Sequence, residues 1–201
     1  MAKLYFKYGA MGSSKTAQAL ITKFNYEERN MKVLLLKPST DTRDGADIVR
    51  SRIGLEAKAV VVRPEEDLYA LVRDSYSDCK AVIVDECQFL TPEQVDQLSE
   101  VSIDMDIAVL CFGLRTDFLT HFFPGSMRLM ELAESITEIK MVCYCGAKAT
   151  VNARLDDEGR VVFEGEQVVL GGNSRYRAMC RKCWLREKRR ALGARAAEVE
   201  R

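Results

Sequence analysis

Short apolar runs alternate with amphipathic segments along the first two thirds of the chain. The runs at Leu4–Tyr8, 31–37, 59–62, Ala81–Val84 and 107–112 are too short for buried helices and predict strands. Helical spacing predicts helices between them, at 16–25, 65–75 and 129–135, and Thr91-Pro92-Glu93 predicts the start of another. Strands that alternate with helices are typical of a parallel sheet. We therefore predict an α/β domain over 1–139, a parallel sheet flanked by helices.

The pattern changes near residue 140. Alternating polar and apolar segments at 150–155, 160–164 and 167–170, with turns at 157–159 and 171–173, predict a small β-rich unit over 140–186. A unit of this size has little apolar core and needs a metal to hold it together. Residues 187–201 are rich in Ala, Arg and Glu and predict a helical or disordered tail.

Composition excludes several classes of protein. With 47% hydrophobic and 30% charged residues, the chain is neither disordered nor fibrous. Thirty basic residues balance thirty acidic ones, which argues against attachment to nucleic acid or membrane by bulk charge. No run spans a bilayer and the start lacks a signal peptide, so we expect a cytoplasmic protein. In that reducing compartment, seven cysteines indicate metal binding or catalysis more readily than disulfides.

The segment between the first strand and the first helix matches the phosphate-loop pattern G-x-x-x-x-G-K-[ST], except that a serine, Ser14, replaces the second glycine. In this pattern, backbone N–H groups and the helix N-terminus hold phosphate. Lys15 would neutralise the phosphate oxygens and Thr16 would hold Mg²⁺. The alternative is a turn of small residues that happens to precede Lys-Thr.

Two acids, Asp85 and Glu86, directly follow the strand Ala81–Val84. The carboxyl end of a parallel strand faces the crevice where open α/β sheets bind ligands. Asp85 would serve Mg²⁺ and Glu86 would accept a proton from the attacking hydroxyl or water. The alternative is an exposed turn with solvated acids.

Four cysteines form two close pairs, Cys143 with Cys145 and Cys180 with Cys183. Four thiolates suit a tetrahedral structural Zn²⁺, which would leave no open position for catalysis. Reduced, unliganded cysteines are the alternative. Cys79, Cys87 and Cys111 lie in or beside apolar runs and are expected in the core.

Four motifs together resemble the type II thymidine kinase family, close to its bacterial members. They are LYFKYGAMGSSKT at the front, VIVDECQFL at 82–90, CFGLRTDF at 111–118 and GEQVVLGGNSRYRAMCRKC at 165–183. The resemblance implies transfer of the γ-phosphate of ATP to the 5′-hydroxyl of thymidine, and of deoxyuridine, in nucleotide salvage. It also implies feedback inhibition by dTTP, a homotetramer, and a lid that starts at Asp41-Thr42-Arg43.

The resemblance assigns roles to individual residues. Glu86 would be the catalytic base and the four paired cysteines the zinc ligands. ATP and Mg²⁺ would be bound by Gly9, Ala10, Met11, Gly12, Ser13, Ser14, Lys15, Thr16, Asp85, Glu86, Cys87 and Gln88. The nucleoside would be bound by Met11, Phe89, Phe118, Gln167, Val168, Val169, Leu170, Gly171 and Tyr176.

Two departures from the family pattern keep other functions open. They are Ser14 and the segment Leu119-Thr120-His121, where bacterial relatives tend to carry an arginine and small residues. A weakened, regulatory paralogue is one alternative. A nucleotide-driven motor of helicase type is a second. A zinc-stapled module with a basic patch for nucleic acid, at 181–190, is a third.

Overall fold

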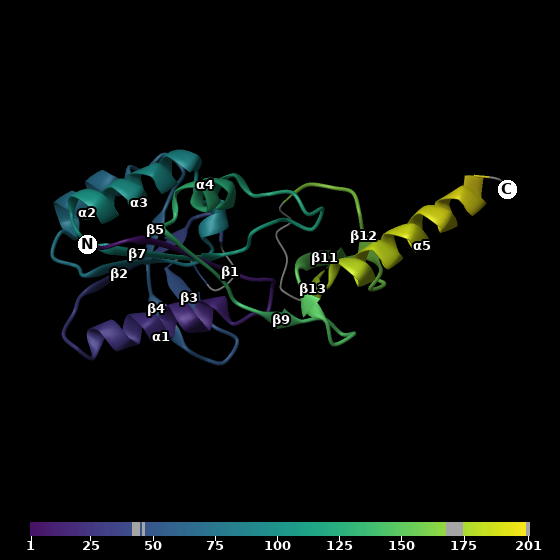
Figure 1. Ribbon diagram of the computed structural model, residues 1–201, viewed down its shortest axis with the longest axis horizontal. Helices are drawn as coiled ribbons and strands as arrows, with labels where there is room; N and C mark the ends of the chain where they lie inside the picture. Colours follow the sequence, from purple (N-terminus) through teal and green to yellow (C-terminus); the bar gives the residue numbers. More distant parts are fainter. Residues whose placement is uncertain (42–44, 46, 168–174, 200–201) are drawn as a thin grey trace. The chain divides into compact units, whose positions relative to one another are not determined.

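The computed structural model describes residues 1–41, 45, 47–167 and 175–199 (Figure 1). It divides into two compact units. The first, here the sheet unit, comprises Met1–Gly9, Ser14–Arg115 and Phe122–Ile139. The second, here the cysteine unit, comprises Ala10–Ser13, Thr116–His121 and the chain from Lys140 onward. None of the helices in the described part of the chain combines the length and apolar character that crossing a bilayer requires.

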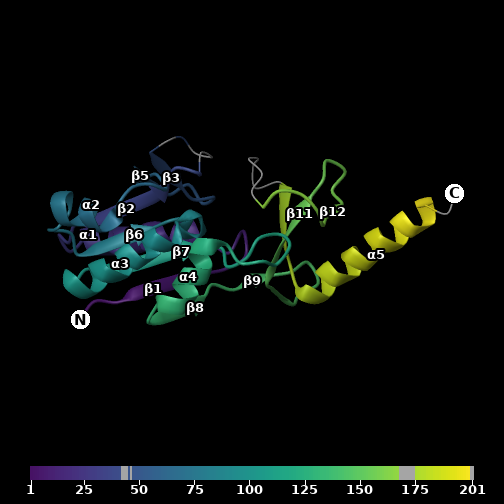
Figure 2. The ribbon, with the colours of Figure 1, turned by 90° about the horizontal axis from the view of Figure 1, so that it is seen from above.

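The sheet unit is built on six parallel strands in the order β5-β2-β6-β7-β1-β8, which confirms the predicted α/β class. Figure 2 shows β2, β6, β7, β1 and β8 side by side. The strands are β1 (Leu4–Tyr8), β2 (Val33–Pro38), β5 (Val60–Val62), β6 (Ala81–Val84), β7 (Ala108–Gly113) and β8 (Ser135–Glu138). β3 (Ile48–Arg50) and β4 (Glu56–Lys58) form a separate two-stranded hairpin, whose Val49 packs into the core on one face of the large sheet.

Both faces of the sheet are buried, because residues alternate between two cores along each central strand. In β6, Val82 and Val84 belong to one core, whereas Ala81 and Ile83 belong to the other. The first core lies under three helices, α2 (Leu68–Ser75), α3 (Pro92–Asp104) and α4 (Pro124–Leu132), and the second under α1 (Lys15–Glu27) (Figure 1). This explains why the strands are continuous apolar runs rather than alternating ones.

Local signals set the start of the helices. The expected start at Thr91 is confirmed: the Thr91 hydroxyl accepts from the Gln94 backbone N–H, and the Gln94 side chain accepts from the Thr91 backbone N–H, both at 3.2 Å. The helix predicted at 65–75 begins later, at Leu68, because the Asp67 carboxylate caps it by accepting from the Ala70 N–H.

The helix predicted at 129–135 is wrong at both ends. It begins earlier, at Pro124, whose fixed backbone suits a first helical position. It ends at Leu132, and Ser135 instead opens the edge strand β8, which pairs with β1. This pairing is a long-range contact, so helical spacing in the sequence did not reveal it. The β3–β4 hairpin was likewise not predicted.

The cysteine unit contains two small sheets and a long helix. β9 (Met141–Val142) pairs with β10 (Lys148–Ala149), while β11 (Val151–Leu155) pairs with β12 (Val161–Val162) and β13 (Tyr176–Met179). Trp184 of α5 (Arg181–Val199) packs edge-to-face on Phe163. Most of the strand expected at 167–170 and the turn at 171–173 lie outside the described residues.

Candidate active site and metal centre

The predicted phosphate loop joins β1 to α1, the context that a phosphate-binding loop requires. Gly9 hydrogen-bonds through its N–H to the Gly113 carbonyl at the end of β7, at 3.3 Å. Lys15 is 8% exposed, and its ammonium donates to the Gly9 carbonyl at 3.1 Å, which folds the side chain back along the loop. Thr16 lies in the first turn of α1, half-buried.

Ser14 adopts the left-handed conformation, with φ of 62°. Most side chains avoid this region because Cβ approaches the backbone, and glycine is the usual residue there. Its side chain is exposed and does not cap α1. The loop therefore requires a left-handed backbone conformation at the position where the pattern has glycine and this chain has Ser14.

The acid pair lies at the carboxyl end of β6, and β7 separates this strand from β1 in the sheet. Asp85 and Glu86 are 5% and 9% exposed, so the alternative of solvated acids is wrong. The Gln88 amide, itself fully buried, donates to the Glu86 carboxylate through Nε2 and accepts from the Leu114 N–H through Oε1 at 2.9 Å. Both acids therefore lie at the carboxyl-terminal ends of the parallel strands, the same end of the sheet at which the phosphate loop leads from β1 to Lys15 and Thr16.

Gly113 makes this arrangement possible. A Cβ atom on Gly113 would lie 2.5 Å from Gln88 Oε1 and 2.6 Å from Cys87 Sγ, closer than real contacts allow. The last position of β7 must therefore be glycine for Gln88 to reach Glu86. Gly113 was not among the predicted site residues; its place at the end of a strand, within the motif CFGLRTDF, was the signal available.

Cys87 is fully buried in the core between the sheet and its helices. Burial, and then the neighbouring Cys111 thiol, raise the pKa of Cys87 well above its ordinary value. A protonated thiol that faces the core is neither a nucleophile nor a metal ligand, so only the backbone of Cys87 can take part in ATP binding.

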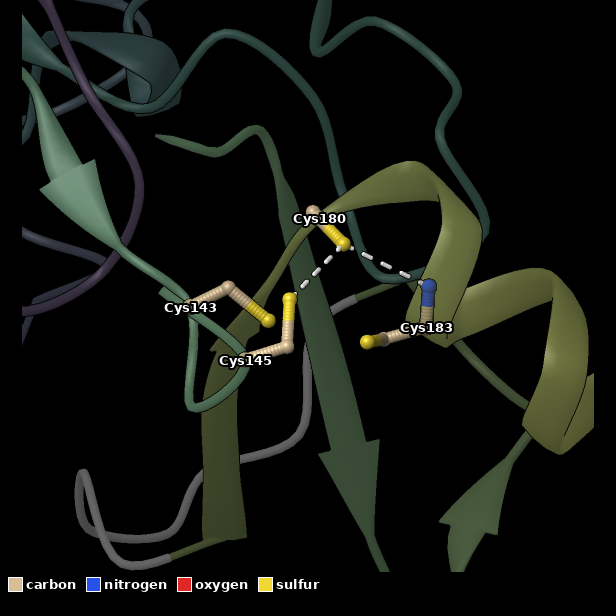
Figure 3. A group of neighbouring side chains, drawn as sticks. All are labelled: Cys143, Cys145, Cys180 and Cys183. Carbon is tan, nitrogen blue, oxygen red and sulfur yellow. Dashed lines mark hydrogen bonds between the residues drawn. The ribbon is translucent and has the colours of Figure 1, made fainter. Parts of the chain in front are cut away.

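The four paired cysteines come together at one point of the cysteine unit (Figure 3). Their sulfur atoms all lie within 4.8 Å of one another, and Cys145 Sγ lies 3.6 Å from Cys180 Sγ. Tetrahedral zinc with bonds of about 2.3 Å separates its sulfur ligands by about 3.8 Å. The donor set and spacing therefore fit a closed four-cysteine metal site.

The cysteines of the cluster differ in charge state. A hydrogen bond with Tyr144 acts to lower the pKa of Cys183, but burial and hydrogen bonds with the other three cysteines outweigh it and raise that pKa to about 11. Burial acts to raise the pKa of Cys143, but backbone hydrogen bonds at Cys145 and Cys180 outweigh it and lower that pKa to about 7. Thiolate is the form that binds metal.

Comparison with known proteins assigns the family. The thymidine kinase family model matches residues 2–184. The chain belongs to the thymidine kinase family. It is 47% identical to the thymidine kinase of Rhodopirellula baltica, over 90% of this chain and 87% of that one. It is 46% identical to that of Legionella pneumophila, over 90% and 88%. Among solved structures, the Pif1 helicase of Candida albicans matches 69% of this chain and 36% of its own with a TM-score of 0.39 and 12% identity, too weak a likeness to bear on function.

The residues that the thymidine kinase resemblance assigns to the nucleoside lie in both units. Phe89 of the sheet unit is half-buried and packs edge-to-face on Phe123, with ring centres 5.8 Å apart. Phe118 of the cysteine unit is 1% exposed and lies under the Arg154 guanidinium, 3.4 Å from its ring centre. Tyr176 begins β13 and pairs with Arg154.

The predicted substrate loop and lid are described only in part. Gln167 donates to the Asp117 carboxylate at 3.0 Å, whereas Val168, Val169, Leu170 and Gly171 lie outside the described residues. At the predicted lid, Asp41 lies 3.7 Å from the buried Lys37 ammonium, and Thr42 and Arg43 lie outside the described residues.

Three polar residues of the cysteine unit were missed by sequence reasoning. Asn152 is buried, accepts from the Met11 N–H at 2.8 Å and donates to the Thr116 carbonyl at 3.1 Å. Asp117 accepts from the Leu119 and His121 N–H groups, both at 2.9 Å, as well as from Gln167. Arg154, buried above Phe118, donates to the Glu166 carbonyl. The contacts of Asn152, and that of Asp117 with Gln167, join segments far apart in the sequence, so no local motif marks them.

Proposed function

We propose that this chain phosphorylates thymidine, and deoxyuridine, with ATP. The observation that carries the proposal is the buried carboxylate of Glu86. It is held by Gln88 at the carboxyl-terminal end of the sheet, where the phosphate loop begins. A general base must be fixed in position and close to the transferred group, and this arrangement meets the first requirement.

In the proposed reaction, the 5′ oxygen of the nucleoside forms a bond to the γ-phosphorus of ATP. The bond from that phosphorus to the β–γ bridging oxygen breaks, ADP leaves, and the 5′-hydroxyl proton passes to Glu86. The loop N–H groups and Lys15 hold the phosphates against the helix N-terminus. When bound, Mg²⁺ neutralises charge on the β and γ oxygens. Thr16 and Asp85 supply the oxygen ligands that it prefers.

We further propose that the nucleoside base contacts Met11, Phe89 and Phe118, with Tyr176 and residues 167–171 completing the binding site. Aromatic faces and backbone amides can read a neutral pyrimidine without a charged side chain. Asn152 supports this role for Met11, because it fixes the backbone of the loop at that residue.

The proposed structural metal is Zn²⁺ at Cys143, Cys145, Cys180 and Cys183. Strand β13, which begins at Tyr176, ends directly before Cys180, so a metal there fixes the downstream end of the segment that carries Tyr176. A structural metal would thus act on activity by holding substrate-binding backbone in place.

We also propose that dTTP inhibits the enzyme by feedback, that the chain assembles as a homotetramer, and that it acts in the cytoplasm. Apolar side chains exposed on the sheet unit, among them Ile21 and Phe24 of α1 and Ile136 of β8, support association between copies. ATP and free nucleosides are cytoplasmic pools, which is why we propose that compartment.

The decisive experiment is ADP release measured with ATP and each of the four deoxynucleosides in turn. We expect release that depends on thymidine, and loss of at least about 100-fold of it in Glu86→Gln with ATP binding retained. Glu93→Gln, an exposed acid at the start of α3, is the matched control. Turnover of E86Q at the wild-type rate would refute the base, and release that needs DNA or RNA instead of thymidine would identify a motor ATPase.

A further inference from the structure

The first turns of α5 carry a concentration of positive charge that the kinase chemistry does not use. Residues 181–190 contain six cations and one acid, although the whole chain has zero net charge. Most of α5 also lies beyond residue 184, where the family match ends. A balanced total charge excludes attachment by bulk charge only and leaves room for a local basic site.

Two of these six cations are engaged in packing. Arg181 and Lys188 lie over the ring of the buried Trp184, 4.5 Å and 5.2 Å from its centre. These cation–π contacts lie within α5 and cover the ring of Trp184, which itself packs on Phe163 of the β-rich part.

The other four form a stripe. Lys182, Arg186, Arg189 and Arg190 are spaced as one face of a helix, all exposed, and line a hollow of about 860 Å³ together with Cys145, Ala147, Cys180 and Cys183. The single acid, Glu187, lies 3.7 Å from Arg186 and 3.4 Å from Arg190. Ion pairs at exposed positions contribute little, so the stripe keeps a strong excess of positive charge.

An exposed aromatic ring stands beside the stripe. Tyr144 is 56% exposed, and its hydroxyl accepts from the Arg186 guanidinium at 2.6 Å. A positively charged groove beside an accessible aromatic ring is the combination with which proteins bind single-stranded nucleic acid, since cations track the phosphates and rings stack on bases. Lys182, Arg186 and Arg190 recur about every 6 Å along the helix, a spacing that suits successive phosphates of an extended strand.

We propose that this surface, the α5 stripe with Tyr144, binds single-stranded nucleic acid without sequence preference. One competing role for the cations is to balance the negative charge of zinc bound by four thiolates. That charge amounts to two, so the four cations of the stripe exceed it. Along the helix axis, Arg189 and Arg190 also lie about 9 and 10.5 Å beyond Cys183.

The test is fluorescence anisotropy with a labelled oligodeoxycytidylate of about 20 nucleotides, which avoids both the thymidine and the ATP site. With four phosphate contacts, the affinity of the zinc-loaded full chain should fall about 50-fold between about 50 and 200 mM salt. The Arg189→Gln/Arg190→Gln variant should bind at least about tenfold more weakly at the lower salt and show a salt slope smaller by about 1.4. Arg29→Gln/Arg63→Gln removes two exposed cations of the sheet unit and should change neither value.

Tyr144 separates nucleic acid from other polyanions. Tyr144→Leu should weaken binding of the oligonucleotide at least about fivefold, whereas Tyr144→Phe, which keeps the ring, should not. No binding at low salt would overturn the proposal. So would equal losses in the two double variants, or polyglutamate that binds as tightly as the oligonucleotide. Zinc content and thymidine phosphorylation should stay unchanged in the double variants, so this proposal and the proposed kinase function fail or stand separately.

Discussion

Replacing Ser14 with glycine should make the protein more stable. Ser14 holds φ of 62° in the phosphate loop, and its exposed side chain caps nothing. A left-handed conformation costs a non-glycine residue about 1–2 kcal/mol. Glycine removes this strain, but it loses more conformational freedom on folding, which lowers the free energy of unfolding by about 0.5–1 kcal/mol. The net gain for Ser14→Gly is therefore about 0.5–1 kcal/mol.

Thermal unfolding measures this gain. For a chain of this length, 1 kcal/mol moves the unfolding midpoint by about 2–4 °C, so we expect a rise of about 1–4 °C. ATP affinity, measured by calorimetric titration, should be equal or tighter, because the loop backbone can approach phosphate without a Cβ atom in between.

Two variants control the experiment. Ser13→Gly changes the neighbouring buried serine, which is absent from the positive-φ residues, so glycine there should destabilise by about 0.5–1 kcal/mol. Ser14→Ala keeps the Cβ atom and should leave the midpoint near that of the wild type. A lower midpoint or weaker ATP binding in Ser14→Gly would refute the reasoning and show that the serine hydroxyl makes a contact of its own.

Three further changes test the site. Gly113→Ala should cost about 1–3 kcal/mol of stability and lower kcat more than tenfold, since its Cβ displaces Gln88 from Glu86; Gly193→Ala, with open space around it, should do neither. Chelation of the metal should speed amide exchange at 141–155 and 176–185, and unchanged exchange would contradict a structural metal. Arg154→Met should raise KM for thymidine but not for ATP, because Phe118 loses the cation above its ring. Arg160→Met, at an exposed position, is the control. Equal effects of the two substitutions on KM would exclude this role for Arg154.

Local interactions explain what could be predicted from the sequence. The central strands β6 and β7, the Thr91 cap, the loop between β1 and α1, and the two cysteine pairs all rest on neighbours within a few residues. Such features depend on apolar run length, capping and ligand spacing, which a sequence displays directly.

Contacts between distant segments decided the rest. The edge strand β8 exists because β1 offers it backbone hydrogen bonds, in a segment whose spacing had indicated a helix. Gly113 matters because Gln88 and Cys87, in the turn that follows β6, fill the space beside it. The cations of α5 were one charged run in the sequence, and only the folded helix divided them into two that pack on Trp184 and four that face a hollow. Each of these outcomes depends on which side chains meet across the fold, and that is set by the packing of the whole domain rather than by neighbours along the chain.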